Sequence, residues 1–149
     1  MNSTIDGDLR RLWVGIAVTV VGVGALIGLT DWSEHSDVGN LFVLDIVVSL
    51  LSIGLLPVLL RWPVPATLAL IVLAAVSPAA TPPATFGVLY VAQRRRFPVA
   101  VAVAGFGIVG HGLRGVWRPI SGLPWGWWFL LVVLGHAALV GWGALSQAR

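Results

Sequence analysis

The stretch Val88-Leu-Tyr-Val-Ala-Gln-Arg-Arg-Arg-Phe-Pro98 places three consecutive arginines between two apolar runs. The rest of the chain carries very little charge, because 58% of its 149 residues are hydrophobic and only 10% are charged. Three adjacent guanidinium groups cannot lie in hydrocarbon, so this stretch predicts a loop at a membrane surface. Cytoplasmic loops carry an excess of basic residues, so we expect Arg94, Arg95 and Arg96 to anchor the topology on the cytoplasmic side.

Composition places the chain among helical membrane proteins. A soluble domain typically carries about 25% charged residues, and several apolar runs here are long enough to cross a bilayer. These runs are continuous rather than alternating, which disfavours a β-barrel. The basic residues are all arginines scattered at segment ends, which disfavours nucleic-acid binding. The absence of cysteine excludes disulfides and thiolate metal sites, and we expect no cofactor and no metal.

The expected fold is an all-α membrane protein, a bundle of about six transmembrane helices with both termini cytoplasmic. We expect residues 1–149 to form a single integral membrane domain that crosses the cell membrane several times. All arginines except Arg114 and Arg118 then fall inside, and the tryptophans fall at predicted boundaries rather than mid-span. The expected spans are approximately 12–29, 41–60, 64–77, 83–93, 98–113 and 125–145.

The third and fourth of these spans are the least ordinary part of the prediction. Segment 64–93 is too short for two full spans, which need about 40 residues plus a turn. A single span would place the arginine cluster outside, against the charge bias. We therefore expect two short helices that turn on the outer side at Pro78, Pro82 and Pro83. A single re-entrant element is the alternative.

Three features near the N-terminus each allow two interpretations. The apolar run 12–29 has no small-residue cleavage site after it, so we expect a retained span rather than a signal peptide. Within it, Gly24 and Gly28 form a G-x-x-x-G pair, for which intramolecular packing is favoured over a homodimer contact. The outer segment 30–40 offers potential cation ligands, although a solvated loop is the favoured interpretation. Those side chains are Asp31, Glu34, His35 and Asp37.

Ionisable residues in or beside the spans are the candidate sensing or ligand-binding residues. Asp45 lies in the second span, close enough to its outer end to reach headgroup water. His136 lies near the middle of the last span, where it could relay a proton, bind a ligand or bond to a neighbouring helix. His111, Arg114 and Arg118 share one helical face if the fifth span continues outward. That stripe could bind an anionic ligand, or anchor the helix at the headgroups.

Three stretches carry a resemblance to a known family. They are the inner turn Leu56-Pro-Val-Leu-Leu-Arg-Trp-Pro63, the span end Leu89-Tyr-Val-Ala-Gln-Arg-Arg-Arg96 and the C-terminal exit Leu145-Ser-Gln-Ala-Arg149. This pattern resembles the N-terminal membrane region of actinobacterial two-component sensor histidine kinases of the NarL/DesK-partnered type. In that family the last span continues into a dimerisation helix with a phospho-accepting histidine, followed by an ATP-binding domain.

The resemblance implies a sensor portion without its kinase core. This chain stops where the dimerisation helix would begin, and His111 and His136 lie in or beside spans, so neither can replace the phospho-acceptor. With no ATP-binding motif either, we expect the chain itself not to be an enzyme. The implied partners are the lipid bilayer and a kinase core or response-regulator system in the cytoplasm.

The leading hypothesis is a membrane-embedded sensor or anchor module that passes an outer-face stimulus through the last helix to a cytoplasmic partner. One alternative is a small transporter or channel subunit that uses Asp45 and His136 in a proton or ion path. Another is a structural membrane protein that binds a partner through glycine-rich spans.

Overall fold

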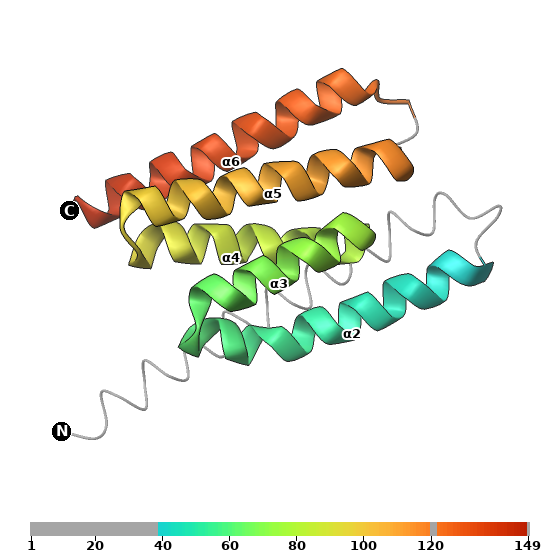
Figure 1. The fold of residues 1–149 in the computed structure, drawn as a ribbon, viewed down its shortest axis with the longest axis horizontal. Helices are drawn as coiled ribbons and strands as arrows, with labels where there is room; N and C mark the ends of the chain where they lie inside the picture. Colours follow the sequence, from blue (N-terminus) through green and yellow to red (C-terminus); the bar gives the residue numbers. More distant parts are fainter. Residues whose placement is uncertain (1–38, 120–121, 149) are drawn as a thin grey trace. The chain divides into compact units, whose positions relative to one another are not determined.

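In the computed structural model, the residues described are 39–119 and 122–148, and they form five α-helices and one short 3₁₀ turn. The elements are α2 (Gly39–Arg61), α3 (Pro63–Val76), η1 (Pro78–Ala80), α4 (Thr81–Arg94), α5 (Phe97–Trp117) and α6 (Trp125–Gln147) (Figure 1). The all-helical fold class is therefore confirmed for this part of the chain. The expected first span, 12–29, and the acidic group Asp31, Glu34, His35 and Asp37 lie outside the described residues.

Prolines set most of the helix beginnings. Pro63 begins α3, Pro82 lies in the first turn of α4, and Pro98 lies in the first turn of α5. The first turn of a helix tolerates proline because its N–H groups have no partner within the helix. Each proline also disfavours helix in the residue before it. The chain therefore reverses at these sites after helices of limited length.

The short proline-broken hairpin is confirmed as two separate helices, α3 and α4, of 14 residues each. At 1.5 Å per residue each is only about 21 Å long. Between them Ser77 has an extended backbone, and its side-chain oxygen accepts a hydrogen bond from the Ala79 N–H at 3.2 Å. This local bond and Pro78 together end α3 and start the 3₁₀ turn.

Three of the described helices are long and apolar enough to cross a membrane, judged by length and composition. The candidate spans are Leu41–Arg61, Phe97–Trp117 and Trp125–Gln147, whereas Pro63–Val76 is apolar but shorter. Large apolar side chains such as Leu50 and Leu131 lie exposed on these helices. Such surfaces fit a membrane protein. Six spans and cytoplasmic termini stay predictions.

Helix α5 continues past the expected span 98–113 to Trp117, so Arg114 lies inside the helix. The helix can continue because the Arg114 guanidinium is buried with a hydrogen-bond partner, Thr81, and an aromatic ring, Trp128. A charged group satisfied in this way does not need to end the helix.

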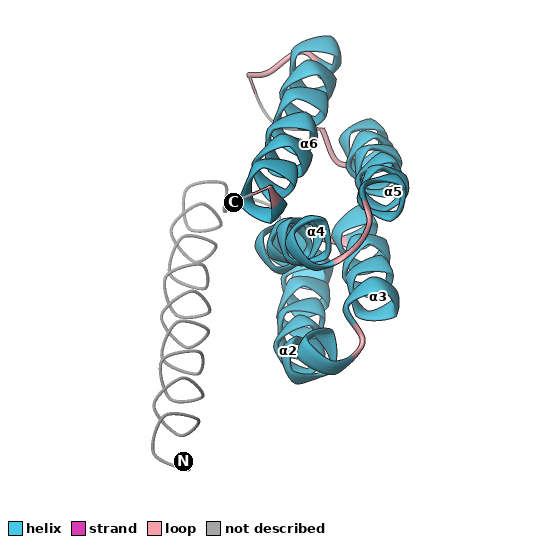
Figure 2. Ribbon diagram, turned by 90° about the vertical axis from the view of Figure 1, so that its left-hand side faces the viewer, coloured by secondary structure: helices cyan, strands magenta, loops and turns pink. Residues whose placement is uncertain are grey.

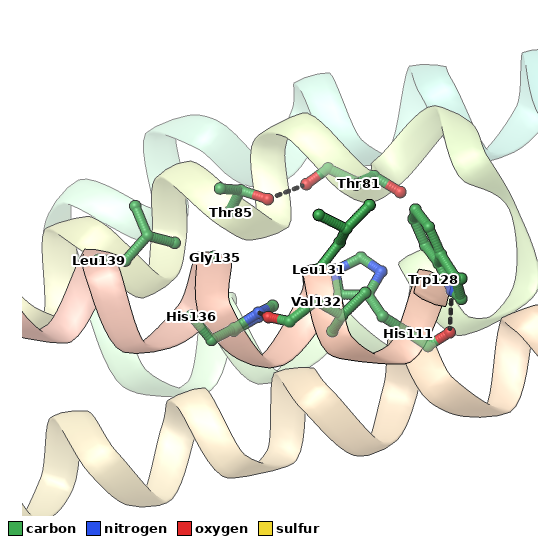
Figure 3. Close-up of a pocket in the computed structure, with 9 residues that line it drawn as sticks. All are labelled: Thr81, Thr85, His111, Trp128, Leu131, Val132, Gly135, His136 and Leu139. Carbon is green, nitrogen blue, oxygen red and sulfur yellow. Dashed lines mark hydrogen bonds between the residues drawn. The ribbon is translucent and has the colours of Figure 1, made fainter. Parts of the chain in front are cut away.

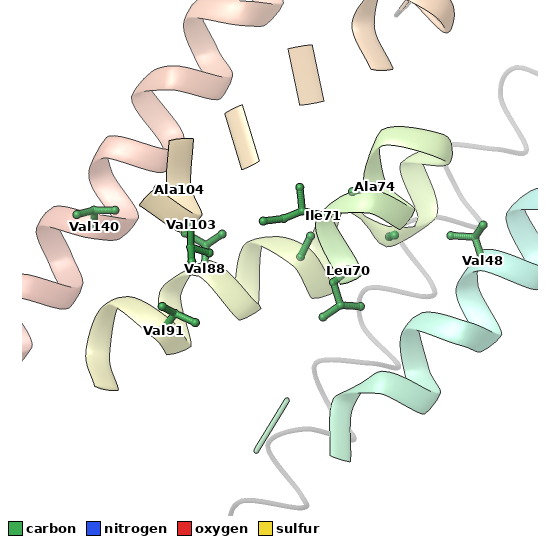
Figure 4. Close-up of a cluster of buried hydrophobic side chains, with 11 residues drawn as sticks. Val48, Leu70, Ile71, Ala74, Val88, Val91, Val103, Ala104 and Val140 are labelled. Carbon is green, nitrogen blue, oxygen red and sulfur yellow. The ribbon is translucent and has the colours of Figure 1, made fainter. Parts of the chain in front are cut away.

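Helix α4 lies amid the other helices, with α5 and α6 on one side and α2 and α3 on the other (Figure 2). The core lies where α3, α4 and α5 meet, with contributions from α2 and α6 (Figure 4). It consists of Val48, Leu70, Ile71, Ala74, Ala80, Ala84, Val88, Val91, Val103, Ala104 and Val140. Valine and alanine predominate, so the backbones approach closely, as is common between membrane helices.

The contact of Gly143 with α4 gives a direct prediction. A Cβ added at Gly143 of α6 would overlap Ala92 of α4, whereas a Cβ at Gly141 meets no atom within 4 Å. We expect Gly143→Ala to destabilise the α4–α6 contact by about 1–3 kcal/mol. Gly141→Ala is the matched control, because it carries the same gain in helix propensity. Thermal unfolding in detergent measures both, and equal midpoints for the two variants would contradict the observed packing.

Candidate functional site

The predicted candidates Asp45 and Arg118 come together in one buried cluster. The Arg118 guanidinium donates two hydrogen bonds to the Asp45 carboxylate, one to each oxygen and each at 2.9 Å. The Ser77 hydroxyl donates a third bond, to Oδ1 of Asp45. Asp45 is 5% exposed, so the carboxylate is neutralised inside the protein rather than solvated. We call Asp45, Ser77 and Arg118 the clasp.

The clasp joins three parts of the chain. Asp45 lies on α2, Ser77 precedes η1, and Arg118 follows the last residue of α5. A two-point arginine–carboxylate pair is among the stronger and more directional hydrogen-bonded contacts in proteins. It therefore fixes the first part of α2 against the α3–α4 turn and the end of α5. Sequence reasoning did not identify Ser77, although a serine before proline is a common capping residue.

Arg114 occupies a second polar cluster beside the clasp. Its Nη1 donates to the Thr81 hydroxyl at 2.9 Å, and its guanidinium lies 4.8 Å from the centre of the Trp128 ring. The Trp117 indole N–H donates to the Ala75 carbonyl at 2.8 Å. A guanidinium over an indole face is attracted by the ring quadrupole. This cluster therefore holds the first turns of α4 and α6 against the last turn of α5.

The stripe His111, Arg114 and Arg118 lies at one end of the bundle, but its members have separate partners. Arg118 bonds to Asp45, Arg114 bonds to Thr81, and His111 faces His136. The charge of Arg118 is thus matched within the protein. The anion-binding interpretation of this stripe stays a prediction.

The two candidate histidines lie next to each other between α5 and α6. The ring centres of His111 and His136 are 5.5 Å apart, and both residues are buried. Nδ1 of His136 lies 2.9 Å from the Val132 carbonyl oxygen, so in the neutral ring it carries the proton and Nε2 is an acceptor. Nδ1 of His111 and Nε2 of His136 have no hydrogen-bond partner among the described residues.

A pocket of about 270 Å³ opens beside this histidine pair (Figure 3). Helices α4, α5 and α6 all contribute to it, and α6 supplies most of the wall. Its polar groups are two hydroxyls, two imidazoles and one indole. Its lining residues are Thr81, Thr85, His111, Trp128, Leu131, Val132, Gly135, His136 and Leu139. We call this the α4–α6 pocket.

Sequence reasoning identified both histidines but missed Thr81, Thr85 and Trp128. A hydroxyl in an apolar helix normally bonds to a carbonyl one turn back, as Thr85 does to Thr81, and so gives little signal. Among the described residues no group of three or more His, Cys, Asp or Glu side chains could hold a metal ion.

The arginine cluster lies at the opposite end of α4 and α5 from the clasp. Arg94, Arg95 and Arg96 are exposed around the α4–α5 turn, and the Arg94 guanidinium lies 4.9 Å from the Tyr90 ring centre. Here Gln147 of α6 donates to the carbonyls of Ala92 at 2.7 Å and Arg95 at 2.8 Å. These bonds attach the end of α6 to the turn. The role of the three arginines as topology anchors stays a prediction.

Comparison with known proteins assigns a family without a function. The chain belongs to the family described as "Domain of unknown function (DUF8318)", whose model matches residues 8–148. No curated protein matches the chain, and no solved structure does.

Proposed function

We propose that this chain is a membrane-embedded sensor module in which a ligand in the α4–α6 pocket shifts α6 and so signals to a cytoplasmic partner. One observation carries the proposal: α6 both walls the pocket, from Trp128 to Leu139, and reaches the opposite end of the bundle at Gln147. A single rigid helix therefore connects the pocket to the end where a partner would bind.

Helix α6 is held to the other helices by neutral hydrogen bonds and by the Arg114–Trp128 cation–π contact, whereas a charged ion pair joins α2 to the end of α5. Helices α2, α3 and α5 are joined by the charged clasp. The side-chain hydrogen bonds from α6 to other helices are neutral: the indoles of Trp125 and Trp128 donate to the Gly112 and His111 carbonyls at 3.3 Å, and Gln147 donates to the Ala92 carbonyl at the far end. Neutral hydrogen bonds contribute about 0.5–1.5 kcal/mol each. Moderate ligand affinity is enough to rearrange them.

The nature of the partner comes from the sequence resemblance. The pattern that ends at Leu145–Arg149 resembles the exit of a sensor histidine kinase membrane region. A kinase core or a response-regulator system is accordingly the proposed partner. The multi-pass topology in the cell membrane, with the arginine cluster inside, belongs to the same proposal.

A kinase core fused after Arg149 tests the proposal through autophosphorylation in proteoliposomes across candidate stimuli. We expect the output to respond, and Gly135→Leu, which adds a side chain at the pocket wall, to abolish the response. Gly141→Leu is the matched control on the same helix, and a Cβ at either glycine meets no atom within 4 Å. Output that never responds would leave only an anchoring role, and equal loss in both variants would exclude the pocket as the sensing site.

The histidine pair favours one alternative, a small transporter or channel subunit. Adjacent imidazoles with unpartnered nitrogens could pass a proton between them. Asp45, the other residue of that hypothesis, bonds to Arg118 and Ser77, away from this pair. Proton flux in proteoliposomes that stops in His136→Ala would favour transport over sensing.

A further inference from the structure

We infer that the α4–α6 pocket binds an uncharged, mainly apolar molecule about one ring in size that carries a hydroxyl group and enters from the lipid side of the bundle. The inference rests on the proposed sensor function, for which it names the ligand class. Four properties of the pocket carry it: its size, its lack of charge, its unpartnered imidazole nitrogens and the direction of its opening.

Size limits the ligand. The volume is about 270 Å³, and a dry protein cavity of about 150 Å³ is sufficient to bind benzene. A single ring with a short alkyl chain therefore fits. A folded peptide segment or a whole phospholipid does not.

The lining excludes a charged ligand. No carboxylate, guanidinium or ammonium group is among the residues that line the pocket. The nearby Arg114 guanidinium donates a hydrogen bond to the Thr81 hydroxyl and makes a cation–π contact with the Trp128 ring. A charged ligand would lose its hydration without gaining a counter-ion, at a large cost in free energy.

Two buried imidazole nitrogens of pocket-lining residues, Nδ1 of His111 and Nε2 of His136, have no hydrogen-bond partner among the described residues. His111 is 2% exposed and lines the pocket, and its Nδ1 has no hydrogen-bond partner among the described residues. Buried polar atoms in proteins are almost always hydrogen-bonded, to protein, water or ligand. A hydroxyl both donates and accepts, so it completes Nδ1 whichever tautomer His111 adopts.

The opening faces the side of the bundle rather than its end. Leu131 on the wall is 54% exposed, and Gly135 beside it is exposed as well. The wall from Trp128 to Leu139 extends along α6 for about 16 Å. Because α6 is one of the helices able to cross a membrane, this opening meets the hydrocarbon layer. The ligand therefore reaches the pocket after partitioning into the lipid.

Histidine ring NMR on the full chain in nanodiscs tests the inference. The chain has only three histidines, so ¹⁵N-histidine labelling gives a spectrum that single variants can assign. We expect 4-propylphenol to shift the His111 Nδ1 resonance saturably. The expected affinity for 4-propyltoluene, in which a methyl group of similar size replaces the hydroxyl, is about tenfold weaker, the effect of one lost hydrogen bond.

The variants and probes distinguish binding in the pocket from binding elsewhere on the protein. Gly135→Leu should abolish the phenol-induced shift, and Gly141→Leu should retain it. No saturable shift, an equal response to 4-propyltoluene, an equal response in Gly135→Leu, or stronger binding of 4-propylbenzenesulfonate would each overturn the inference. A kinase fusion that still responds to another stimulus would show that the ligand class failed while the sensor function stands.

Discussion

Replacing Arg118 by alanine is expected to destabilise the bundle by about 3 kcal/mol, because it leaves the Asp45 carboxylate buried without its counter-ion. The Ser77 hydroxyl would then be the remaining partner shown for that carboxylate. The expected loss lies at the low end for a broken buried pair, since the Arg118 side chain is 23% exposed and water screens part of the interaction. Equilibrium unfolding in mixed detergent measures the change.

A double-mutant cycle separates the ion pair from side-chain packing. Asp45→Asn with Arg118→Ala should cost less than the sum of the two single variants, because the neutral amide no longer needs a cation. Arg96→Ala is the matched control: this exposed arginine lies at the other end of the bundle, and exposed substitutions usually change stability by about 0.5 kcal/mol or less. Additive effects of Asp45→Asn and Arg118→Ala would contradict the clasp.

The clasp also shows where sequence reasoning stops. Asp45 and Arg118 were both identified as candidates, yet each had an ordinary explanation as a group that reaches the headgroups. Their pairing spans 73 positions of the sequence. Apolar helices give no periodic signal that fixes which faces meet, so a contact at this separation cannot be derived from one sequence. Two charged residues of opposite sign at the same membrane end were the available clue.

The hairpin was predictable because its causes are local. Proline restricts its own backbone and that of the residue before it, so 64–93 had to break near Pro78. The sequence allowed α5 either to end near residue 113 or to continue outward, and the Arg114 partners that accompany the longer helix, Thr81 and Trp128, come from other helices. The α4–α6 pocket likewise depends on contacts between different helices. Its two histidines could be identified as unusual residues, but the wall needs the packing of α4 against α6.

Adding a methyl group at Gly107 should displace His136. A Cβ at this position would lie 2.5 Å from Nε2 and 2.9 Å from Cδ2 of the His136 ring. The ring is also held on its other side by the 2.9 Å bond from Nδ1 to the Val132 carbonyl. It cannot move away without weakening that bond. We therefore expect Gly107→Ala to cost about 1–3 kcal/mol by overpacking and to shift the ring ¹⁵N resonances of His136.

The same substitution should become harmless once the ring is removed. In a His136→Ala background, Gly107→Ala has no imidazole to meet, and the gain in helix propensity of about 0.5–1 kcal/mol remains. Gly105→Ala on the same helix is the matched control, since a Cβ there meets no atom within 4 Å. The sign of the Gly107→Ala effect should therefore reverse between the two backgrounds, while that of Gly105→Ala stays the same. A Gly107→Ala cost that persists without His136 would mean that the glycine serves another contact between α5 and α6.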